Sequence, residues 1–213
     1  YTAAANREGH APMTNTERFR EFVRDFTRLV EADGASEATM LAEGGRLLGA
    51  LVAHDDWLPD DCAQPHPQYY QQYLLHCDPL ERFSIVSFVW GPGQKTPVHD
   101  HTVWGLVGVM RGTELCRRFR PGSPMPASEQ QRLERGSVDR LSPAQGDIHE
   151  VANAWDDRVS ISIHVYGGNI GAVQRHVFDP ATGAVKPFVS GYSNRQLPNV
   201  WDRSSEVRAA IRP

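Results

Sequence analysis

Apolar residues recur every three to four positions between residues 14 and 53, and this spacing predicts two amphipathic helices. Thr14 and Glu17 have the spacing of an N-terminal capping box, and Gly34 is predicted to end the first helix. The second helix is expected to begin after Ser36. Such apolar stripes are typical of core-facing surfaces, so we expect this segment to pack on the rest of the chain.

The pattern changes to that of strands beyond an acidic, proline-rich loop at residues 54–68. From about residue 69 to residue 192, short apolar or alternating runs are separated by turn signals rich in Gly and Pro. Short strands at such intervals are typical of an all-β sandwich or barrel. The chain is therefore predicted to be mainly β, with N-terminal α-helices packed on a barrel at about residues 69–192.

Length and composition favour one globular domain. The chain has 213 residues, of which 40% are hydrophobic and 23% charged, and its net charge is -4. The lack of a basic bias argues against nucleic acid as a partner. No apolar run approaches the roughly 20 residues of a membrane helix, so no membrane partner is expected. We expect a single domain over residues 14–213, preceded by a disordered tail at residues 1–13.

The cysteines Cys62, Cys77 and Cys116 are odd in number and contain no CxxC pair. They form neither a disulfide framework nor a zinc motif. Each is interpreted as a small buried or half-buried hydrophobe. Unpaired cysteines of this kind favour a reducing, cytoplasmic compartment.

Two histidines, His99 and His101, stand one residue apart within Pro97–Gly112, a stretch rich in strand-forming residues. Side chains at positions i and i+2 of a strand point to the same face, so both imidazoles can hold one metal ion. Two ordinary surface histidines would have the same spacing. The pair alone leaves both interpretations open.

The segment Val159–Tyr166 alternates strictly between apolar and polar residues. Its polar face carries Ser162, His164 and Tyr166, whose hydroxyl, imidazole and phenol groups can form a hydrogen-bonded chain. Inside a small barrel this face would line a pocket, whereas on an outer sheet it would face solvent.

Two stretches resemble the metal-binding motifs of the cupin superfamily: Gly93–Gly112, which contains the histidine pair, and Gly146–Asn153, which contains His149. The resemblance implies a double-stranded β-helix (jelly-roll) barrel in which His99, His101 and His149 converge on a metal.

The glutamate that normally follows the histidine pair in cupins is absent, and Gly105 occupies a slot where it would fall. Three neutral imidazoles would leave a divalent ion with its full charge and with open positions. Such a site favours an anionic ligand, above all a thiolate. Zinc held by three histidines is the alternative that the ligand type leaves open.

The two triads together resemble the cysteine dioxygenase type I family, and the similarity runs from about Tyr69 to Tyr192. The segments RFSIVSFVWGPGQKTPVHDHTVWGLVGVMRG and SISIHVYGGN carry it. The resemblance implies a mononuclear non-haem Fe(II) enzyme that adds both atoms of O2 to a small thiol and yields a sulfinic acid. It also implies that Tyr166, aligned by His164 and Ser162, donates a hydrogen bond in the site.

The chain departs from the animal enzymes of that family at two places. Gly105 and Leu106 fill the region of the cysteine that cross-links to the active-site tyrosine, so we expect no cross-link to Tyr166. The arginine that binds the substrate carboxylate is replaced by glutamine, with Gln72 the first counterpart and Gln71 the second.

This pattern resembles the bacterial Gln-type subgroup, which includes 3-mercaptopropionate dioxygenases. Arg175 is expected to bind the carboxylate of L-cysteine or 3-mercaptopropionate instead. Two other classes stay open, namely a non-catalytic metal-binding cupin and a zinc or manganese cupin isomerase or hydrolase.

Overall fold

The computed structural model describes residues 15–200, and the tail expected at residues 1–13 lies outside this range. The helical elements precede the strands. They are α1 (Thr16–Glu31), α2 (Glu37–Thr39), the π-helix η1 (Met40–Gly44), α3 (Gly45–Val52) and the 3-10 turn η2 (Asp60–Cys62). Within residues 15–200, no helix combines the length and the apolar character that crossing a bilayer would require.

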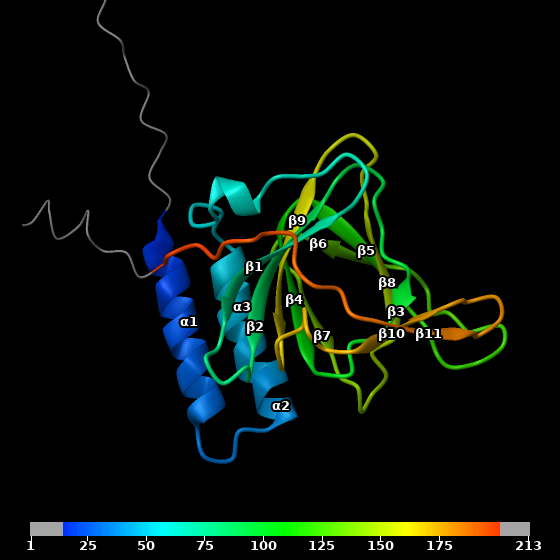
Figure 1. Ribbon diagram of the computed structural model, residues 1–213, viewed down its shortest axis with the longest axis horizontal. Coiled ribbons are helices and arrows are strands. Elements are labelled where there is room, and N and C mark those ends of the chain that lie inside the picture. The colour runs from blue at the N-terminus through cyan, green and yellow to red at the C-terminus, as the bar shows by residue number, and fades with distance from the viewer. Residues whose placement is uncertain (1–14, 201–213) are drawn as a thin grey trace, which may run out of the picture.

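The strands form two antiparallel sheets (Figure 1). The first sheet contains, in order, β1 (Gln71–Cys77), β2 (Ser84–Trp90), β9 (Ser160–Tyr166), β4 (Gly105–Arg111) and β7 (Val138–Leu141). The second contains β11 (Val185–Phe188), β10 (Arg175–Phe178), β3 (Val98–His99), β8 (His149–Asn153), β5 (Thr113–Arg118) and β6 (Gln131–Glu134). The chain passes repeatedly between the sheets, and the prediction of a mainly β, cupin-type barrel with N-terminal helices is confirmed.

The central strand β9 explains how the core and the interior of the barrel are separated. It pairs with β2 on one side and β4 on the other, and all seven of its residues are buried. One face, with Ile161, Ile163 and Val165, packs in the same apolar cluster as residues of α1 and α3. Burial of each such side chain contributes about 1.5–3 kcal/mol. Figure 1 shows the helices together on that side of the sheets, so the polar face of β9 turns into the barrel.

The helix boundaries differ from those expected. Helix α1 begins at Thr16 with Asn15 as its N-cap, so the predicted capping box was misplaced, and Thr14 lies outside the described residues. The helix ends at Glu31, before the turn that contains Gly34. The second helical segment starts after Ser36 as predicted, with the Ser36 hydroxyl accepting a hydrogen bond from the backbone N–H of Thr39.

The stretch Pro97–Gly112 is not one strand, contrary to the sequence expectation. Strand β3 ends at His99, and Thr102 then adopts a left-handed conformation with φ of 58°. The chain turns there and enters β4 in the other sheet. Alternation along a strand therefore does not place His101, and its position needs another cause.

Candidate metal centre

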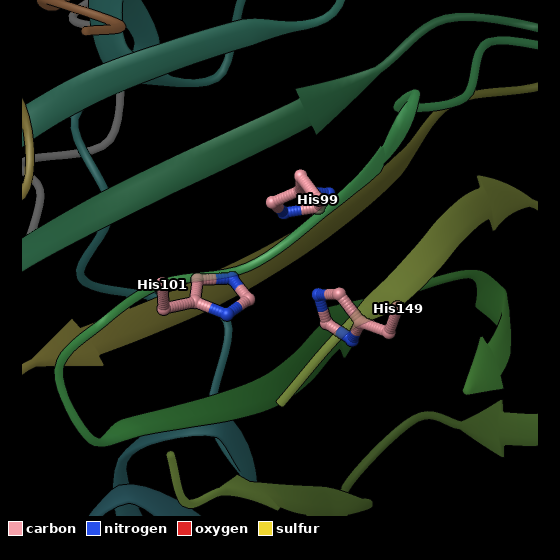
Figure 2. A group of neighbouring side chains, drawn as sticks. All are labelled: His99, His101 and His149. Carbon is pink, nitrogen blue, oxygen red and sulfur yellow. The ribbon is translucent and has the colours of Figure 1, made fainter. Parts of the chain in front are cut away.

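Three buried histidines meet inside the barrel. His99 ends β3 and is the register partner of His149, the first residue of the neighbouring strand β8. The three ring centroids lie 4.8–4.9 Å apart, and the candidate ligand nitrogens lie within 4.8 Å of one another. Figure 2 shows the rings of His99, His101 and His149 turned toward a common centre. The structure thus brings together the three residues expected to hold a metal.

The carboxylate of Asp147 holds His101 in this arrangement. Its Oδ2 accepts hydrogen bonds from the backbone N–H groups of His101 at 2.7 Å and of Thr102 at 3.3 Å. The same oxygen lies 3.4 Å from His101 Nδ1. The turn that follows β3 is therefore fixed by a residue two positions before His149, and both histidine segments share this anchor.

Burial keeps all three imidazoles neutral. It lowers the pKa of His99 to about 4 and holds the pKa values of His101 and His149 well below their ordinary range. Neutral imidazole is the form that binds a metal ion. Neither ring nitrogen of His101 makes a hydrogen bond, although the side chain is fully buried. A buried nitrogen without a partner is costly, so the residues fit a divalent metal ion as the missing partner.

Hydrogen bonds from the back of the rings orient two of the histidines. His99 Nδ1 lies 3.0 Å from the carbonyl oxygen of Pro97, and His149 Nδ1 lies 3.6 Å from the Cys116 thiol. Such partners fix a ring and leave its Nε2 for a metal. The sequence analysis assigned Cys116 only a packing role. Nothing in the neighbouring sequence signals its contact with His149, which arises from the pairing of β5 with β8.

The polar face of β9 forms the hydrogen-bonded chain expected from its alternation. The Ser162 hydroxyl lies 2.8 Å from His164 Nε2, and His164 Nδ1 lies 2.7 Å from the Tyr166 hydroxyl. The Tyr166 ring stacks on His101 with 5.4 Å between centroids, which places the end of the chain at the metal centre. Burial lowers the pKa of His164 to about 3 and raises that of Tyr166 above its ordinary value, so both groups are neutral near pH 7.

Gly105 lies against the Tyr166 ring. A Cβ atom at this position would lie 3.0 Å from Tyr166 Cδ1 and 3.2 Å from a methyl group of Leu141. A side chain here could not be accommodated without moving the tyrosine. The slot where cupins carry a glutamate therefore contributes no ligand in this chain.

A cavity of about 180 Å³ adjoins His99 and contains both residues expected to bind the substrate. Arg175 is only 3% exposed, donates to the Ser190 hydroxyl at 2.7 Å and lies over the Phe188 ring. Its Nε has no hydrogen-bond partner, and no acid forms an ion pair with it among residues 15–200. Gln72 lines the same cavity, whereas the Gln71 amide donates to backbone carbonyls.

A larger hollow of about 590 Å³ lies between α1 and the turn from β1 to β2. The three arginines that line it are each paired with a neighbouring acid. Its lining includes none of the three clustered histidines, so the smaller cavity is the one connected to the candidate metal centre.

Comparison with known proteins agrees with this site. The family model for cysteine dioxygenase type I matches residues 69–179, more than half of the chain. The protein belongs to the cysteine dioxygenase type I family. The match covers both histidine segments, all of β9 and Arg175, and it ends before β11.

Solved structures similar to this cysteine dioxygenase family member include two cupin-type proteins. One is an uncharacterised protein with a double-stranded β-helix domain from Klebsiella pneumoniae, with 14% identity, a TM-score of 0.43, and coverage of 62% of this chain and 87% of the other. Another is a cupin superfamily protein from Desulfitobacterium hafniense, with 13% identity, a TM-score of 0.42, and coverage of 55% and 94% respectively.

Proposed function

We propose that the protein is a thiol dioxygenase that oxidises a small thiol carboxylate to its sulfinic acid. In this reaction both atoms of O2 join the sulfur of the thiolate, and no further reductant is consumed. The observation that carries the proposal is the position of one uncompensated arginine, in the cavity beside three neutral buried histidines. Such a cavity provides a place for a carboxylate and, next to it, a place for a thiolate.

The metal that we propose is a single non-haem Fe(II) ion held by His99, His101 and His149. Family membership supports iron, whereas three imidazole ligands by themselves also suit zinc. When bound, iron would supply the redox chemistry that joins O2 to a thiolate. Because no carboxylate ligand accompanies the histidines, the ion would keep its full charge and favour an anionic sulfur ligand.

Substrate binding is assigned to Arg175 and Gln72. The guanidinium donates to Ser190 through one terminal nitrogen, and its unpaired Nε remains available to a carboxylate. A charged hydrogen bond of this kind is strong and directional. Gln72 offers a neutral amide to the same cavity and makes weaker bonds. Tyr166, held by His164 and Ser162, is placed to donate a hydrogen bond to the bound substrate.

We expect 3-mercaptopropionate to be a better substrate than L-cysteine. Cysteine can use both its sulfur and its amine as metal ligands, and its carboxylate then needs a cation at the position that Gln72 occupies. An acid without the amine can turn its carboxylate toward Arg175 instead. A higher kcat/KM for L-cysteine would contradict this account of the cavity.

Metal analysis combined with an oxygen-electrode assay tests the proposal. The protein purified with iron is offered 3-mercaptopropionate, L-cysteine and cysteamine, and the product is identified as the sulfinic acid by mass spectrometry. His149→Ala should lose both iron and O2 consumption, while His54→Ala, at an exposed loop histidine, serves as the matched control. A metal-loaded protein that consumes no O2 with any thiol would indicate a non-catalytic cupin. Turnover without O2 would indicate a zinc or manganese isomerase or hydrolase.

A further inference from the structure

Glu114 is a carboxyl group enclosed inside the barrel. It lies on β5, has no exposed surface, and neither of its oxygens makes a hydrogen bond of normal geometry. The polar groups that act on it are the hydroxyl of Ser162 and the indole of Trp90, which come from the opposite sheet. No cation forms an ion pair with Glu114 among the described residues. Burying an acid in this way is costly, so its presence calls for an explanation.

Glu114 stands at the end of the Ser162–His164–Tyr166 chain that is remote from the metal centre. The Trp90 indole N–H donates to Ser162 Oγ at 3.2 Å, and Ser162 in turn contacts His164. The buried acid, the serine, the histidine and the tyrosine therefore form one polar series. Its two ends are Glu114 on β5 and the Tyr166 hydroxyl beside the metal centre.

The direction of every hydrogen bond in this series depends on Ser162. An indole N–H can only donate, so Trp90 always occupies one of the two acceptor positions of the serine oxygen. A neutral imidazole has one donor nitrogen and one acceptor nitrogen. Once the serine hydrogen has a direction, the tautomer of His164 and the orientation of the Tyr166 O–H both follow.

Two arrangements are possible. If Glu114 is ionised, the Ser162 O–H donates to it, His164 Nε2–H donates to Ser162, and the Tyr166 O–H donates to His164 Nδ1. If Glu114 is protonated, it can donate to Ser162, whose hydrogen then goes to His164 Nε2. His164 Nδ1–H then donates to the Tyr166 oxygen, and the phenol hydrogen is free to point into the cavity.

We propose that Glu114 is a positioning residue whose protonation directs the Tyr166 hydroxyl toward the bound substrate. The inference rests on the proposed function in one respect, namely that Tyr166 donates to the substrate. Ionisation of Glu114 reverses the series and removes that donor. The site therefore contains a built-in alkaline limit that is independent of the thiol.

The surroundings of Glu114 favour the protonated form near neutral pH. Burial raises the pKa of Glu114 to about 8, so the acid ionises only above that pH. The titratable groups that interact with it are Cys116 on its own strand and Tyr166 on β9. Burial raises the pKa of both, so neither carries charge at this pH, and no neighbouring base removes the proton from Glu114.

Infrared difference spectroscopy of the full chain tests the inference without turnover. The carbonyl band of a protonated carboxylic acid should disappear with a midpoint near pH 8 and should be absent from Glu114→Gln. The C–O band of Tyr166, assigned with Tyr166→Phe, should shift with the same midpoint in the wild type, because the phenol changes from acceptor to donor toward His164. In Glu114→Gln it should not shift, since the glutamine amide donates at every pH. Glu129→Gln, at an exposed acid, is the matched control.

Turnover provides the second readout. With saturating thiol, kcat of the wild type should fall roughly 10- to 100-fold above about pH 8, the range for losing an outer hydrogen-bond partner. This alkaline decline should be absent from Glu114→Gln and also from Ser162→Ala, in which the acid still titrates but no longer reaches His164. An unprotonated Glu114 at neutral pH, or the same alkaline decline in both variants, would overturn the inference. A protein without thiol turnover that still shows the linked infrared bands would contradict the proposed function alone.

Discussion

Replacing Glu114 with glutamine is predicted to change how the free energy of unfolding depends on pH. Burial raises the pKa of this carboxyl from 4.5 to about 8 in the folded protein, whereas in the unfolded chain it returns to the ordinary range. Between these two pH values the folded state holds a proton that the unfolded chain has released. Raising the pH therefore favours unfolding.

The size of the effect follows from the two pKa values. A tenfold difference in proton affinity corresponds to about 1.4 kcal/mol. Relative to Glu114→Gln, which cannot ionise, the wild type should lose about 3 kcal/mol of stability from pH 4.5 to pH 7 and about 5 kcal/mol by pH 8. The loss should be absent below about pH 4.5 and complete above about pH 8. It is large beside the roughly 5–15 kcal/mol that stabilises a typical domain.

Urea denaturation of both proteins over this pH range, in the same metal state, measures the difference. Other titrating groups contribute equally to the two proteins, so subtraction isolates Glu114. The exposed-site variant Glu129→Gln should follow the wild type at every pH. A difference between wild type and Glu114→Gln that stays constant from pH 4.5 to pH 8 would refute the assignment of a protonated, buried acid.

Three further predictions concern the metal centre and the cavity. His149→Ala should lose iron on metal analysis while its circular dichroism spectrum is largely retained, and a variant with full iron content would contradict the ligand set. Tyr166→Phe should retain iron and lower kcat by roughly 10- to 100-fold, and unchanged kinetics would remove the tyrosine from the reaction. Arg175→Ala should raise KM for 3-mercaptopropionate and L-cysteine at least tenfold, about the loss of one charged hydrogen bond. Cysteamine, which has no carboxylate, should be unaffected, and unaltered KM values for both acids would rule out the proposed role of Arg175.

The sequence by itself determined the features that depend on local periodicity. Strict alternation from Val159 to Tyr166 was enough to place Ser162, His164 and Tyr166 on one face, because successive side chains of a strand point to opposite sides. The order and spacing of the histidine motifs also sufficed for the family, since they reflect the strands from which the barrel is built.

Tertiary structure decided which of these faces meet. His101 is placed by a turn anchored on Asp147, and this turn replaced the continuous strand that the sequence predicted. Gln72 and Arg175 share one cavity although 103 positions separate them, because β1 and β10 lie in facing sheets.

Glu114 shows the physical reason most clearly. By sequence it is one charged residue in a strand of mixed character, with no periodic partner. Its burial arises because the pairing of β5 with β8 turns it toward Ser162 and Trp90 on the other sheet. Periodicity sets the direction of a side chain relative to its own strand, whereas its environment, and with it its charge, is set by contacts between strands far apart in the chain.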